Sequence, residues 1–94
     1  MRAKFYFDIE VRRGTDLSVP DTFSLAVKII HGSGKLFALA LPDLKRRSLG
    51  DLLRVFGEDQ PTLEAIQDWI ANGPLDDYVS IRRVKAVQIG RAHV

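Results

Sequence analysis

Apolar and polar side chains alternate without interruption over residues 4–12, and this stretch restricts the possible folds most strongly. The apolar side chains occupy the odd-numbered positions: Phe5, Phe7, Ile9 and Val11. The even-numbered positions carry polar or amphipathic residues. Because successive side chains of a strand point to opposite faces, the pattern predicts a β-strand with one buried and one more solvated face. The remaining segments must therefore cover one side of this strand.

A second segment has the spacing of an amphipathic helix. The apolar side chains that share one helical face are Phe23, Ala26, Val27 and Ile30. We expect Ser18 or Asp21 to cap the start of this helix, because short polar side chains accept hydrogen bonds from the first free amides. The helix is expected to end near His31, since Gly32 and Gly34 can both adopt positive φ.

A second amphipathic helix is predicted over residues 62–71. Leu63, Ile66 and Ile70 form its apolar stripe, and Trp69 lies at the edge of that stripe. The sequence Asn-Gly-Pro at positions 72–74 is expected to end this helix.

Three further segments are predicted to be extended. Residues 36–41, LFALAL, form an apolar run typical of a central strand covered on both faces, although periodicity alone does not exclude a helical segment there. Residues 49–56 alternate as a third strand. Residues 77–89 form the last extended stretch. Its apolar parity changes across Arg82 and Arg83, which predicts a bulge or a break between two short strands.

The order of these elements is strand, helix, strand, strand, helix, strand. Two split βαβ units in this order predict an α+β fold, the ferredoxin-like βαββαβ sandwich. Its four-stranded antiparallel sheet carries both helices on one face. We expect residues 1–94 to form a single such domain, because there is no linker, repeat or low-complexity tract. The fold alone does not identify a function.

Composition excludes several classes of function. The chain has no cysteine, so disulfides and thiol catalysis are excluded. No apolar run approaches the ~20 residues of a membrane span, and the N-terminus has no signal-peptide core, so we expect a cytoplasmic protein without a membrane partner. The net charge is only +2. Basic side chains nevertheless gather in two places, a run at positions 45–47 and an acid-free C-terminal group: Arg82, Arg83, Lys85, Arg91 and His93.

The glycine-rich loop at positions 32–35, GSGK, does not have the arrangement of a phosphate-binding loop. It follows a helix, and the carbonyl end of a helix repels anions. The two histidines, His31 and His93, have no metal-ligand spacing, so no metal or other cofactor is expected. No Ser/His/Asp triad is specified by the sequence.

His31 has two interpretations. It is either a helix C-terminal histidine favoured by the macrodipole, or a general base or acid near neutral pH. Lys28 and Lys35 lie close to it in sequence and could supply positive charge beside a phosphodiester. Cleavage of RNA needs a base for the 2′-hydroxyl proton and cations for the phosphorane, with no metal ion.

Four segments in order resemble the CRISPR repeat-cleaving endoribonuclease of type I-F systems. They are Tyr6-Phe7-Asp8-Ile9, a helix ending at His31, LFALALPDL at 36–44 and RSLGDLLRVFG at 47–57. The resemblance implies the ferredoxin-like N-terminal half of that family and metal-independent processing of precursor CRISPR RNA at a repeat hairpin. The product would be a 2′,3′-cyclic phosphate, and His31 would inherit the role of general base by its position.

Other parts of that family's pattern are not matched here. In the family, an arginine-rich helix grips the hairpin, and a serine and an aromatic residue complete the active site, all in a second half. We therefore expect Lys28, Lys35, Arg82 and Arg83 to contact RNA only weakly, and cleavage by this chain alone to be weak or absent.

Leu25 and Ile29 lie opposite the predicted core face of the first helix. They are either scattered surface residues or a strip on which a second half or a CRISPR effector subunit would pack. Two alternatives to the ribonuclease interpretation follow. One is a non-catalytic relative that acts as a decoy, inhibitor (anti-CRISPR) or interaction module in the effector assembly. The other is an unrelated ferredoxin-like interaction domain.

Overall fold

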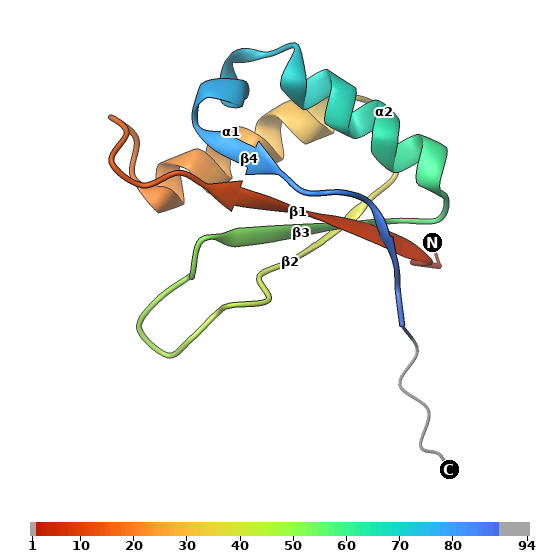
Figure 1. Cartoon of the computed structure of the whole chain (residues 1–94), viewed down its shortest axis with the longest axis horizontal. Coiled ribbons are helices and arrows are strands. Elements are labelled where there is room, and N and C mark those ends of the chain that lie inside the picture. The colour runs from red at the N-terminus through yellow and green to blue at the C-terminus, as the bar shows by residue number, and fades with distance from the viewer. Residues whose placement is uncertain (1, 89–94) are drawn as a thin grey trace.

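The computed structural model describes residues 2–88 and shows an antiparallel sheet with both helices on one face (Figure 1). The elements in chain order are β1 (Phe5–Val11), α1 (Val19–Gly32), β2 (Ala38–Ala40), β3 (Leu52–Gly57), α2 (Gln60–Ala71), the 3-10 turn η1 (Pro74–Asp77), β4 (Val79–Ile81) and β5 (Lys85–Ala86). The strands lie in the order β2-β3-β1-β4, and β5 also pairs with β1. This topology confirms the predicted ferredoxin-like α+β fold.

The first strand occupies the centre of the sheet, as its alternation requires. Phe7 pairs with Val55 of β3, Ile9 with Leu53, and Val11 with Val79 of β4. These side chains share the face that the helices cover, and burying them there removes apolar surface from water. The core is completed from α1, α2 and η1 by Phe23, Ala26, Ile30, Leu63, Ile66, Ile70 and Leu75.

Both helices begin where short polar side chains can cap them. The Ser18 hydroxyl accepts a hydrogen bond from the amide of Asp21 at 3.2 Å, so Ser18 is the cap of α1. Asp59 caps α2 by accepting from the amide of Thr62 at 2.8 Å. At the other end of α1, only Gly34 adopts positive φ (73°), whereas Gly32 is the last helical residue. The expectation that both glycines break the helix is therefore half correct.

The segment predicted as a central strand is an edge strand instead. β2 has only three residues and pairs with β3 alone, and Ala38 and Ala40 are exposed. Alanine has a small side chain, so its exposure on an edge strand leaves little apolar surface in contact with water. Leu36, just before β2, is 64% exposed. The prediction of a central strand covered on both faces is therefore wrong for residues 36–41.

The predicted interruption of the last strand is confirmed. β4 pairs with the C-terminal end of β1, and β5 pairs with its N-terminal end, at Phe5 and Tyr6. Residues 82–84 between them are outside both strands. Ile89, Arg91 and His93, which were part of the sequence-based predictions, lie outside the described residues. Within residues 2–88 no helix has the length and apolar character needed to cross a membrane.

Candidate functional site

His31 is exposed in the last turn of α1, next to the loop that leads to β2. Its ring packs against the Phe37 ring in a T-shaped arrangement, with ring centroids 5.1 Å apart. The two side chains line an open cavity of about 440 Å³ together with Lys35, Leu36 and Leu39. The imidazole is therefore accessible, held on a helix and flanked by a cation.

The loop after His31 is shaped by local hydrogen bonds. The Ser33 hydroxyl donates to the Ile30 carbonyl at 2.6 Å and accepts from the Lys35 amide at 3.3 Å. The Gly34 amide donates to the His31 carbonyl at 3.2 Å. These contacts satisfy carbonyls that the helix end leaves free, and they turn the chain so that Lys35 comes back beside His31.

Trp69 anchors the same turn from the second helix. Its indole Nε1 donates to the Ile29 carbonyl at 2.8 Å, although the residue is 52% exposed. A Cβ at Gly32 would meet the indole at 3.8 Å. Because this bond joins α2 to the last turn of α1, it fixes the backbone from which the His31 side chain extends.

The four predicted RNA-contacting cations fall in three places. Lys35 shares the cavity of His31. Lys28 lines a separate groove between α1 and β2. Arg82 and Arg83 lie between β4 and β5, at the opposite edge of the sheet from β2. The structure thus brings together His31 and Lys35, and the RNA-binding roles of all four stay predictions.

Leu25 and Ile29 are half-buried and pack against the core, so less of their surface is exposed than their predicted position opposite the core face indicated. Ile29 also borders a small cavity of about 330 Å³ next to Trp69 and Pro74. Their proposed role in binding a partner stays a prediction.

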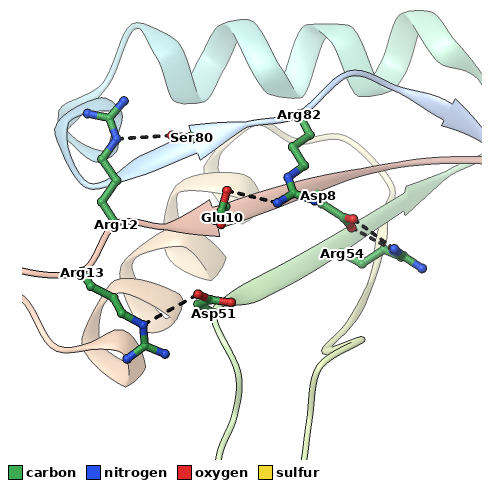
Figure 2. A network of polar contacts seen from close by, with 8 residues as sticks. All are labelled: Asp8, Glu10, Arg12, Arg13, Asp51, Arg54, Ser80 and Arg82. Atoms are coloured by element: carbon green, nitrogen blue, oxygen red, sulfur yellow. Dashed lines mark hydrogen bonds and ion pairs between the residues drawn. The ribbon is translucent and has the colours of Figure 1, made fainter.

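Polar side chains on the face of the sheet away from the helices form a network (Figure 2). Asp8 accepts two hydrogen bonds from Arg54, one from Nε at 2.8 Å and one from Nη2 at 3.0 Å. Alternation predicts Asp8 on a solvated face, yet it is only 7% exposed. The bidentate pairing compensates for its burial, and the hydrogen bonds that Arg54 donates to Asp8 raise the pKa of Arg54. Glu10 accepts from Arg82 at 3.1 Å in a more exposed pair.

The same open face carries an aromatic group that was not predicted from the sequence. Tyr6 and Phe56 lie opposite each other on β1 and β3 and line a hollow of about 890 Å³ with Arg54, Arg83 and Lys85. The alternation of each strand predicts its ring on the more solvated face. The pairing of the two rings, however, depends on the register between β1 and β3. Phe37, the ring against His31, was also missed, because its position depends on the loop.

A family model described as CRISPR-associated protein (Cas_Csy4) matches residues 6–94. The match covers nearly the whole chain, including both the His31 helix and the open face. The chain belongs to the Csy4 family. Family membership implies CRISPR-associated RNA processing and interaction with CRISPR repeat RNA, in type I-F systems. No curated protein matches the chain closely enough to count as a relative.

Within residues 2–88 no three histidine, aspartate or glutamate side chains lie close enough to hold a metal ion. The relation of the chain to the Csy4 family also excludes the alternative of an unrelated interaction domain.

Proposed function

We propose that this chain forms the RNA-handling part of a metal-independent endoribonuclease that processes precursor CRISPR RNA, with His31 as general base. The observation that carries the proposal is the position of His31. The imidazole is exposed at a rigid helix end, packed edge-on against Phe37 and beside Lys35. Membership of the Csy4 family supplies the substrate class, CRISPR repeat RNA.

The reaction balances with the residues present. Neutral His31 removes the proton from a ribose 2′-hydroxyl, and the 2′-oxygen attacks the adjacent phosphorus. The bond from phosphorus to the 5′-oxygen breaks, giving a 2′,3′-cyclic phosphate and a 5′-oxygen that takes a proton from solvent. Lys35 stabilises the additional charge on the phosphorane, since a fixed cation interacts most strongly where charge develops. Lys28, one turn before His31, lines the separate groove between α1 and β2, and we propose that it contacts RNA outside the His31 cavity.

The chain by itself should bind a hairpin weakly. Neither α1 nor α2 contains an arginine, and the net charge of the chain is +2. Phosphate contacts supply most of the affinity for structured RNA, so few such contacts give low occupancy. Arg82 is also partly neutralised by Glu10. We propose that tight binding needs further RNA contacts, from additional protein sequence or from effector subunits.

Single-turnover cleavage of a labelled type I-F repeat hairpin tests the proposal, with protein in large excess and a chelator present. We expect slow cleavage, and His31→Ala should reduce the rate by about 10²-fold or more, the usual contribution of a general base. His93→Ala is the matched control, because His93 is the other histidine of the chain. RNA that stays intact after long incubation would reject cleavage by this chain, and equal rates for both variants would reject His31 as the base.

A further inference from the structure

The face of the sheet turned away from the helices presents two aromatic rings on neighbouring central strands. Tyr6 of β1 pairs with Phe56 of β3, and their ring centroids are 6.0 Å apart with an interplanar angle of 50°. On the other side of β3, Ala38 and Ala40 pair with Phe56 and Arg54. These small side chains are exposed, and the Tyr6 and Phe56 side chains are half-buried. No described helix lies over this face (Figure 1).

The charges around the rings favour an anionic ligand. The Arg54 guanidinium lies over the Tyr6 ring, 4.2 Å from its centroid, and Asp8 fixes its orientation. The two carboxylates of β1 on this face, Asp8 and Glu10, are both engaged by arginines (Figure 2). Arg83 and Lys85 line the same hollow as the rings, and within residues 2–88 neither has an ion-pair partner.

We infer that this open face binds unpaired nucleotides of RNA, with bases stacked on Phe56 and Tyr6 and phosphates next to Arg83 and Lys85. This inference rests on the proposed function and assigns a binding surface separate from the His31 cavity. Base faces are free to stack on side chains only where the RNA is not paired. Aromatic residues on the two central strands of a four-stranded sheet are a general means of binding such nucleotides. A basic border argues against an apolar protein partner.

The two surfaces are linked by the short edge strand. Phe37 contacts His31, and its neighbour Ala38 pairs with Phe56. An RNA strand leaving the His31 cavity therefore reaches the rings by passing around β2. The nucleotides bound there would be the single-stranded flank of the repeat hairpin rather than its stem.

Fluorescence anisotropy with an unpaired RNA of about ten nucleotides, and with a blunt duplex of the same sequence, tests the inference. We expect Phe56→Leu, which keeps an apolar side chain but removes the ring, to weaken binding of the unpaired RNA by about tenfold. Duplex binding should change by less than about twofold, and Phe56→Trp should restore affinity for the unpaired RNA. Circular dichroism melting verifies that each variant is folded.

Several outcomes would overturn the inference: unpaired RNA that does not bind, Phe56→Leu with unchanged affinity, or equal losses for unpaired and duplex RNA. If Phe56→Leu keeps its affinity for RNA but no longer binds a protein partner, the face is a protein-binding surface instead. Failure of the proposed function is distinguishable, because the hairpin would stay uncut while unpaired RNA still bound. The inference alone fails if the wild type cuts the hairpin but Phe56→Leu binds the unpaired RNA as tightly as the wild type does.

Discussion

Asp8 and Arg54 form a bidentate ion pair across β1 and β3, with N–O distances of 2.8 and 3.0 Å. The pair sits at the centre of the open face, where Arg54 also covers the Tyr6 ring. It therefore couples the stability of the two central strands to the shape of the proposed RNA surface. A carboxylate this buried requires such pairing, because desolvation of a charge is costly without it.

Replacing Asp8 tests that coupling. Asp8→Ala should lower the free energy of unfolding by about 2 kcal/mol, because it leaves a partly buried guanidinium unpaired. Glu10→Ala is the matched control on the same strand, and its exposed pair with Arg82 should contribute about 0.5 kcal/mol or less. Urea denaturation of both variants gives the comparison. Equal losses would show that the Asp8 pair has no special role.

Gly50 holds the start of β3 against the preceding loop. Its φ is +72°, and a Cβ there would lie 2.9 Å from the Asp43 carbonyl oxygen. Gly50→Ala should therefore cost more than the roughly 1 kcal/mol of a left-handed conformation alone. Gly14→Ala is the control, since Gly14 has φ +83° with open space around it. If thermal melts show the same loss of stability for both variants, the structure relieves the close contact with Asp43 without losing stability.

Trp69 stabilises the helix end that carries His31. Trp69→Phe keeps an aromatic ring but removes the hydrogen bond to the Ile29 carbonyl, so the free energy of unfolding should fall by about 1 kcal/mol. The variant should also cut RNA more slowly, because the last turn of α1 is less firmly held. Denaturant titration and the cleavage assay measure the two effects. An unchanged midpoint would mean that water replaces the indole without loss.

The cap of α2 gives a pH dependence of stability. Hydrogen bonds from the Thr62 side chain and amide lower the pKa of Asp59. A lowered folded-state pKa means that the cap contributes fully above the ordinary aspartate pKa of about 3.9 and is lost as pH falls through the folded value. Asp59→Asn keeps a capping side chain that does not titrate. Below about pH 4 the melting temperature of the wild type should therefore fall relative to that of Asp59→Asn. A difference between the two melting temperatures that does not change with pH would contradict this.

The elements that local periodicity defines could be predicted from the sequence. The strict alternation of β1 and the Leu63, Ile66 and Ile70 stripe of α2 each reflect which side chains face the core. The parity change across Arg82 and Arg83 marks the break between β4 and β5, although both residues of β5 are exposed. Together with the order of the elements along the chain, these patterns were sufficient to predict the ferredoxin-like fold. The exposed position of His31 also agrees with its place off the apolar face of α1.

Contacts between distant segments could not be predicted in this way. The burial of Asp8 and the pairing of Tyr6 with Phe56 both depend on the register between β1 and β3, which the parity of a single strand does not specify. The position of Phe37 against His31 depends on the loop conformation set by Ser33 and Gly34. The edge position of β2 follows from the topology of the whole sheet and could not be predicted from the local apolar pattern of residues 36–41.

The most direct test of the catalytic proposal replaces the attacking group of the substrate. A repeat hairpin with a single 2′-deoxyribose immediately before the scissile phosphate should bind as the all-RNA hairpin does. It should stay uncut by the wild-type chain, because His31 then has no 2′-hydroxyl proton to remove. The all-RNA hairpin should give a 2′,3′-cyclic phosphate under the same conditions. Cleavage of the deoxy-substituted hairpin at the same phosphate would contradict the proposed role of His31.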